Sequence, residues 1–236
     1  MIFLIQTHKG RVVDDFAFAL MASVDFYKWK DKNTSLKYIL VDTIPKLDAA
    51  KISDIVPVGS IEFVDRYVNL YYGLSLSPIN IPPELMIPRF SGRGIEICHT
   101  AHITSKNFVK SMTKLKGLTT ICENSQIPKD VYQVSDVVSF ESEYRAFVYK
   151  TELQGLQWYS GDFTLFPDVG TIKEMIVCYT QAPIAYTLDV GIMSGKTVII
   201  ECHDFYSCGL YGFSNYKILP YMFSQWFFEY LRKNKQ

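Results

Sequence analysis

The sequence lacks any long hydrophobic run and any excess of charge of one sign. Its 236 residues carry 24 Lys and Arg against 24 Asp and Glu. No segment has the roughly 18 unbroken apolar residues of a membrane helix, and a non-specific nucleic-acid binder usually has a marked basic excess. We therefore expect neither a membrane nor a nucleic acid as a partner.

Cysteine is scarce, and the sequence has no internal repeat or low-complexity tract. The five cysteines are odd in number and lie mostly in apolar or strand-like stretches, which is typical of reduced thiols rather than of a disulfide framework. Residues 1–9 lack the basic lead and long apolar core of a signal peptide, and their pattern predicts a β-strand. These features predict a cytoplasmic protein.

What the chain does have is hydrophobic and aromatic content, at 48% and 15% of residues, which is typical of a folded, strand-rich protein. The predicted fold class is α/β followed by α+β, with a domain boundary near Ser105 that gives domains 1–104 and 105–236. In the first domain the patterns predict strands at 2–5, 38–41 and 56–60 and helices at 14–29 and 60–70 in an open parallel sheet. In the second they predict strands at 108–111, 118–122, 137–140, 144–149 and 155–160, and helices at 171–181 and 221–231.

Two acidic residues stand out on a predicted hairpin between residues 171 and 221. Residues 185–192 and 197–204 are β-branched, apolar runs joined by a Ser-Gly-Lys turn. The first run carries Asp189 and the second carries Glu201. Two carboxylates held close together need a positive partner, for which a hard divalent cation is the usual choice. Two interpretations stay open at this point, a metal site and a pair of acids that face solvent.

Cations follow the same ambiguity. Lys110 ends an apolar strand, where a lysine either reaches the surface or points into a cleft as a phosphate ligand, and Lys116 lies on the next turn beside Gly117. Glu143 and Arg145, two apart on a strand, share one face and form either a surface ion pair or part of a polar cleft. Arg89 and Arg93, by contrast, are expected to be solvated loop arginines.

Taken in order, several short segments resemble the ATP-grasp superfamily, and in particular a compact clade with a small α/β domain before a short ATP-grasp core. The resemblance covers nearly the whole chain, and its segments are Val58-Gly-Ser-Ile-Glu-Phe63, Phe108-Val-Lys110 with Lys116-Gly117, Ser142-Glu-Tyr-Arg-Ala-Phe-Val148, 182–191, and Glu201-Cys-His-Asp204 running into Gly209-Leu-Tyr-Gly212. It implies a nucleotide bound between two β-rich lobes.

The resemblance also implies roles for individual residues. It assigns Lys110 and Lys116 to the nucleotide phosphates, with Lys116 also catalytic. The adenine would meet the backbone of Val137, Val138 and Ser139. The final assignments are Glu143 beside the nucleotide, Arg145 as a catalytic residue on the substrate carboxylate or the transferring phosphate, and Asp189, Glu201 and His203 as metal ligands.

His203 is the one departure from the family pattern, which usually has Asn two residues after the second carboxylate. Imidazole is a poorer ligand for Mg²⁺ than an amide oxygen and suits softer metals better. The implied cofactors are therefore ATP and Mg²⁺, with Mn²⁺ as an alternative metal. The neighbouring Asp204 is an alternative source of an oxygen ligand.

The implied function is that of an ATP-dependent carboxylate–amine ligase, a carbon–nitrogen bond-forming enzyme that acts through an acyl phosphate. Its partners would be a small-molecule or peptide carboxylate and an amine, in a peptide or amino-acid ligation, and a homo-oligomer stays open. The alternative is a weakened ATP-grasp-like protein that binds nucleotide or acts by interaction. A third hypothesis is an interaction module whose acids are surface decoration.

Overall fold

The chain divides into two compact units. The computed structural model describes residues 1–48, 52–99 and 102–234. Unit 1 comprises Met1–Leu76, Pro183–Tyr186 and Asp204–Gln236, and unit 2 comprises Ser77–Ala182 and Thr187–His203. Both ends of the chain therefore contribute to unit 1, whereas most of unit 2 is one continuous segment.

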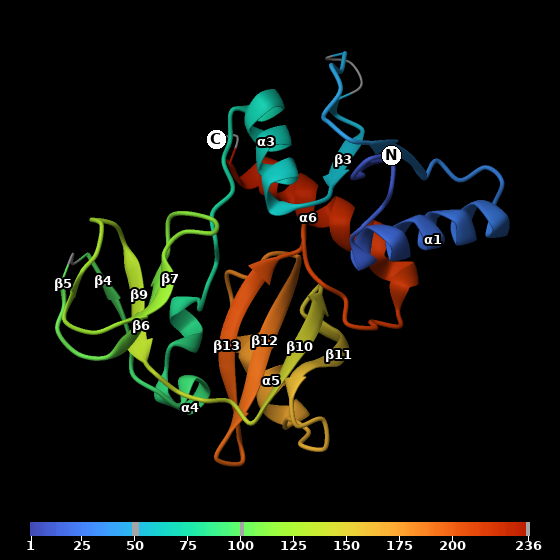
Figure 1. Ribbon diagram of the computed structural model, residues 1–236. Coiled ribbons are helices and arrows are strands. Elements are labelled where there is room, and N and C mark those ends of the chain that lie inside the picture. Colours follow the sequence, from blue (N-terminus) through green and yellow to red (C-terminus); the bar gives the residue numbers. More distant parts are fainter. Residues whose placement is uncertain (49–51, 100–101, 235–236) are drawn as a thin grey trace. The chain divides into compact units, whose positions relative to one another are not determined.

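Unit 1 is built on a three-stranded parallel sheet with the strand order β2-β1-β3. Figure 1 shows α1, α3 and α6 around this sheet. The elements are β1 (Ile2–Gln6), α1 (Asp15–Lys30), β2 (Lys37–Val41), β3 (Ile55–Val58), α3 (Ile61–Tyr72), η2 (Tyr216–Ile218) and α6 (Leu219–Asn234). The predicted strands, helices and open parallel sheet of the first seventy residues are confirmed.

Local chemistry explains where α3 begins and ends. The Oγ of Ser60 accepts a hydrogen bond from the amide of Phe63, which caps the first turn as predicted. Gly73 ends the helix in the left-handed conformation, with φ of 66°, where a residue without Cβ is favoured. Tyr67 of α3 packs against Phe227 of α6 with ring centroids 6.2 Å apart, so the two helices share a core.

Unit 2 contains two four-stranded sheets. The first has the order β4-β9-β6-β7 and antiparallel pairs throughout. Its strands are β4 (Ile95–Cys98), β6 (Asn107–Ser111), β7 (Thr119–Cys122) and β9 (Tyr132–Asp136), beside a small pair of β5 (His102–Ile103) and β8 (Ser125–Gln126). Val109, Tyr132 and Val134 lie in its core. The short helices η1 (Pro83–Leu85) and α4 (Pro88–Ser91) precede it.

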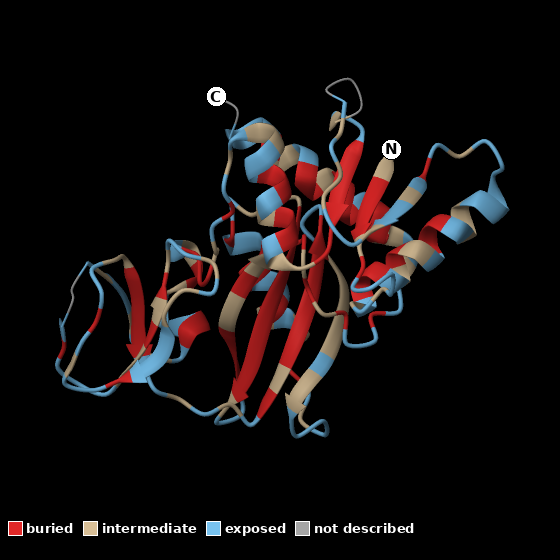
Figure 2. Ribbon diagram, turned by 45° about the horizontal axis from the view of Figure 1, so that its top comes forward, coloured by how far each residue is buried: buried red, intermediate tan, exposed pale blue. Residues whose placement is uncertain are grey.

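The second sheet carries the predicted hairpin. Its order is β11-β10-β12-β13, and the elements are β10 (Ser142–Tyr149), β11 (Glu152–Gly161), α5 (Val169–Cys178), β12 (Ala185–Met193) and β13 (Lys196–Asp204). Ser194 and Gly195 form the turn with φ of 50° and 72°, the positive values that a two-residue hairpin turn requires. Figure 2 shows that β12 is buried along most of its length. The hairpin prediction is confirmed.

Two expectations differ from the structure. The pattern of residues 137–140 predicts a strand, but these residues form an irregular link between β9 and β10. The apolar run there lines a cavity instead of pairing with a neighbouring strand. The compact units divide after Leu76, whereas the sequence pattern predicts a boundary near Ser105, because β4 pairs with β9 and so joins residues 95–98 to unit 2.

Candidate active site

Three neighbouring strands of unit 2 bring charged side chains together. Arg145 lies on β10, Asp189 on β12 and Glu201 on β13, and these strands are adjacent in the sheet. Glu201 and His203 are two apart on β13 and therefore share a face. The sheet order places on one surface the residues that the sequence separates by more than fifty positions.

Arg145 and Asp189 form a buried ion pair. The Nε of Arg145 donates to Oδ1 of Asp189 at 2.8 Å, and its Nη2 donates to Oδ2 at 2.7 Å. Such a two-bonded arrangement is the strong, directional form of an arginine–carboxylate contact. The side chain of Asp189 is only 2% exposed. The hypothesis that this acid faces solvent is therefore wrong.

Glu201 is held by two basic side chains. Its Oε2 accepts a hydrogen bond from the Nζ of Lys110 on β6, and its Oε1 lies 2.7 Å from Nε2 of His203. Burial alone would raise the pKa of the Glu201 carboxyl, but the contacts with His203 and Lys110 outweigh it and lower the pKa to about 2. Glu201 is thus a stable carboxylate, and Lys110 points into the site rather than into solvent.

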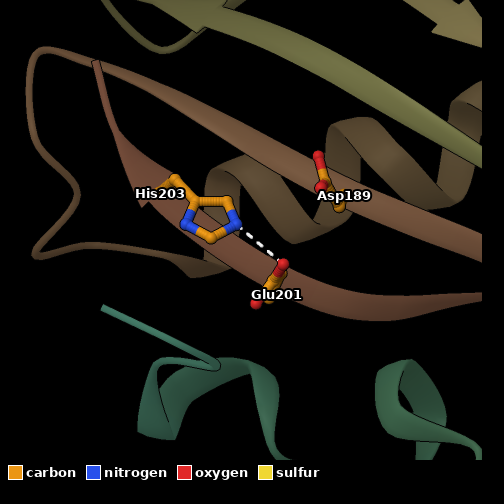
Figure 3. A group of neighbouring side chains, drawn as sticks. All are labelled: Asp189, Glu201 and His203. Carbon is orange, nitrogen blue, oxygen red and sulfur yellow. Dashed lines mark ion pairs between the residues drawn. The ribbon is translucent and has the colours of Figure 1, made fainter. Parts of the chain in front are cut away.

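Asp189, Glu201 and His203 form a group that can hold a metal ion. One ligand atom from each residue lies within 4.8 Å of the others, and Figure 3 shows the His203 ring turned toward Glu201 with Asp189 on the adjacent strand. Two carboxylates and an imidazole are suitable donors for a divalent cation. The donor set therefore fits the implied metal, and its nitrogen suits Mn²⁺ better than Mg²⁺.

A tyrosine that the sequence analysis missed joins this group. The hydroxyl of Tyr159, on β11, donates to Oε2 of Glu143 at 2.9 Å. The guanidinium carbon of Arg145 lies 5.9 Å from the centroid of the Tyr159 ring. Glu143 and Arg145 therefore share a polar surface, as their spacing predicted. No sequence signal singled out Tyr159, because β11 contains several aromatic residues.

A cavity of about 170 Å³ lies beside the link between β9 and β10. Its lining is mostly apolar and aromatic and is formed by Arg93, Phe108, Ile121, Ser135, Asp136, Val137, Val138 and Phe140. A flat heterocycle needs apolar faces and a few polar groups at its edge. Val137 and Val138, predicted to meet an adenine, are among the lining residues, whereas Ser139 is not.

The remaining basic residues have different settings. Lys116 is exposed on the turn between β6 and β7, with φ of 51°, and does not line the cavity. Arg89 is exposed and pairs with Glu174, as expected of a loop arginine. Arg93 is half-buried instead, because its Nη1 donates to the carbonyl of Ile199 at 2.8 Å.

In unit 1, Asp204 accepts a hydrogen bond from Nε1 of Trp226 at 2.7 Å. One of its oxygens is therefore already engaged in that unit.

Solved structures with the same fold include ligases and synthetases. The chain matches D-alanine–D-alanine ligase from Bacillus anthracis over 98% of both chains, with 8% identity and a TM-score of 0.55. The same ligase complexed with ATP matches with a TM-score of 0.52, 8% identity and 98% coverage of both chains. N5-carboxyaminoimidazole synthetase from Staphylococcus aureus matches with a TM-score of 0.56 and 10% identity, over 95% of this chain and 77% of the other. These likenesses define the class of protein as one with the ATP-grasp fold, so the predicted fold class is confirmed.

The sequence gives the family itself. The model of an ATP-grasp domain family, the second family of its clade, matches residues 90–220, which is more than half of the chain. The chain therefore belongs to this ATP-grasp family, and the predicted family resemblance is confirmed. A search of curated proteins found no match. Within the described ranges, no helix combines the length and the apolar character needed to cross a bilayer.

Proposed function

We propose that the protein is an ATP-dependent carboxylate–amine ligase with its active site in unit 2. The observation that carries the proposal is the group formed by Asp189, Glu201 and His203 together with Lys110 and Arg145. It offers metal ligands and phosphate-binding cations within one set of contacts. Phosphoryl transfer depends mainly on positioning and on neutralising charge, which such a group supplies.

The proposed reaction has two steps. A substrate carboxylate oxygen attacks the γ-phosphorus of ATP, which gives an acyl phosphate and ADP. An amine then attacks the acyl carbon and phosphate leaves, so an amide bond forms. Arg145 would hold the substrate carboxylate or the transferring phosphate, and Lys110 and Lys116 would hold the nucleotide phosphates. A bound divalent cation would neutralise phosphate charge.

The nucleotide would extend from the cavity beside Val137 and Val138, where its adenine has apolar walls, toward Lys110 and Glu201. Glu143 would lie beside the nucleotide. Ser139 stays part of the proposal through its backbone groups only, since its side chain is not in the cavity lining. The metal would be Mg²⁺ or Mn²⁺, held by Asp189, Glu201 and His203.

The substrates are proposed as small-molecule or peptide carboxylates and amines. D-alanine–D-alanine ligase, which shares the fold, motivates amino-acid or peptide ligation as the reaction to test first. We also propose a cytoplasmic location, because the five cysteines are free.

The test is nucleotide binding followed by turnover. At ATP concentrations a hundredfold above Kd, with MgCl₂ or MnCl₂, the wild type should gain about 2.7 kcal/mol of stability, seen as a raised melting temperature. Asp189→Asn and Glu201→Gln should lose most of this gain, whereas Glu152→Gln, an exposed carboxylate at the start of β11, should keep it. Release of ADP with pooled amino acids then measures ligation. ATP turnover that ignores both site variants would refute the assignment.

A second candidate is a protein of this family that binds nucleotide without ligating. It is favoured by His203 at the position where the family usually has Asn. It predicts the same ligand-induced rise in melting temperature but no ADP release with any carboxylate and amine. An exchange of His203→Asn that created turnover would support this second candidate.

A further inference from the structure

The strand β11 contains an irregularity at Tyr159. In its pairing with β10, Glu143 lies opposite Ser160 and Tyr144 lies opposite Trp158, so the register shifts by one residue at Tyr159. An extra residue of this kind is a β-bulge, which redirects a side chain and is common next to active sites. The bulge accounts for the way in which Tyr159 contacts side chains of β10.

Tyr159 makes two kinds of contact with that surface. Its hydroxyl donates to Glu143 at 2.9 Å, and its ring lies 5.9 Å from the guanidinium carbon of Arg145. Burial and then the charges of Asp189 and Glu143 raise the pKa of Tyr159 well above its usual value. The phenol therefore stays protonated and remains a hydrogen-bond donor to Glu143 at every pH in which the protein is folded.

We propose that Tyr159 is a positioning residue, which fixes Glu143 through its hydroxyl and Arg145 through its ring. The inference rests on the proposed function, in which Glu143 lies beside the nucleotide and Arg145 acts on the reacting groups. The hydroxyl and the ring act on different partners. Their removal should therefore change different kinetic constants.

The first variant is Tyr159→Phe, which keeps the ring and removes the hydroxyl. A hydrogen bond to a charged group is strong enough that its loss should raise the Kd and the KM for ATP about three- to tenfold. The value of kcat should stay within about twofold, because the aromatic face beside Arg145 remains. The Kd is measured by calorimetry, which does not depend on turnover.

The second variant is Tyr159→Leu, which also removes the ring. Its kcat should fall about tenfold or more in addition to the weaker binding, because Arg145 loses the aromatic surface against which it lies. The matched control is Tyr144→Phe, one strand away, whose hydroxyl donates instead to the carbonyl of Leu165 at 2.8 Å. The control should bind ATP like the wild type.

The possible results separate the two proposals. A wild type that bound no ATP would refute the proposed function and the role of Tyr159 with it. A wild type that bound ATP while Tyr159→Phe bound equally well would overturn the role of Tyr159 alone. Equal losses of affinity in Tyr159→Phe and Tyr144→Phe would also overturn it, because they would reveal a general destabilisation rather than positioning of Glu143.

Discussion

At the scale of single residues, the pair of Arg145 and Asp189 couples stability to the proposed site. Asp189 is almost fully buried and both of its oxygens accept from Arg145. Removing one partner leaves an unpaired buried charge, which typically costs about 3–5 kcal/mol. We expect Arg145→Met to lower the free energy of unfolding by this amount, as measured by urea denaturation.

The double variant Arg145→Met with Asp189→Asn removes both charges and should recover a large part of that loss. A single variant Arg145→Met that unfolded within about 1 kcal/mol of the wild type would contradict a buried, unpaired Asp189. The coupling energy of the four proteins then measures the ion pair itself.

Glu201 should make stability depend on pH in acid. Its folded pKa of about 2 lies below its ordinary value of 4.5. A depressed carboxyl pKa stabilises the folded state above the ordinary value, and this contribution disappears as the pH falls from about 5 toward 2. A shift of this size corresponds to about 3 kcal/mol. Urea denaturation without added metal at pH 6 and pH 3 should show a smaller loss for Glu201→Gln than for the wild type, and an equal loss would disprove the shift.

At the scale of elements, β12 and the link between β9 and β10 meet at Gly191. A Cβ built there would lie 2.4 Å from Cδ1 of Phe140, a residue that lines the cavity. Gly191→Ala should therefore displace the Phe140 ring, cost about 1–3 kcal/mol of stability and weaken ATP binding. Chemical denaturation and calorimetry measure the two effects.

Gly195→Ala, in the turn of the same hairpin, is the control. Nothing lies within 4 Å of its Cβ position, but its φ is 72°. It should lose about 1–2 kcal/mol from backbone strain while ATP binds as in the wild type. Unchanged ATP affinity in Gly191→Ala would show that Phe140 does not border the nucleotide.

How far the sequence could predict these elements depends on the range of the signal. The hairpin of β12 and β13 has local turn chemistry and β-branched strands, and the capped start of α3 depends on Ser60 and residues next to it. Both predictions are confirmed. The strand predicted at 137–140 is wrong, because an apolar run that lines a cavity has the same pattern as a strand.

The site shows the same limit. The spacing of Glu143 and Arg145 indicated a shared surface, and the family pattern indicated Asp189, Glu201 and His203. Tyr159 escaped because a β-bulge depends on pairing between two strands, which one-dimensional periodicity does not report.

At the scale of the whole molecule, unit 1 is assembled from both ends of the chain. Phe227 of α6 is fully buried and contacts Tyr67 and Tyr72 of α3, with ring centroids 6.2 and 6.0 Å away. The folding of the first seventy residues therefore depends on a helix that begins at Leu219. Replacing a buried phenylalanine by alanine typically costs about 3–5 kcal/mol.

We therefore expect Phe227→Ala to destabilise unit 1 by that amount, and Phe228→Ala, which removes a side chain that is 38% exposed, to cost less than about half as much. Trp226 is buried beside Phe227, and it is the only tryptophan left when Trp29 and Trp158 are replaced by phenylalanine. Its fluorescence in that background reports the unfolding of unit 1 in urea. If Phe227→Ala left this transition unchanged, the N-terminal segment would fold without α6, and the two ends of the chain would not form one cooperative unit.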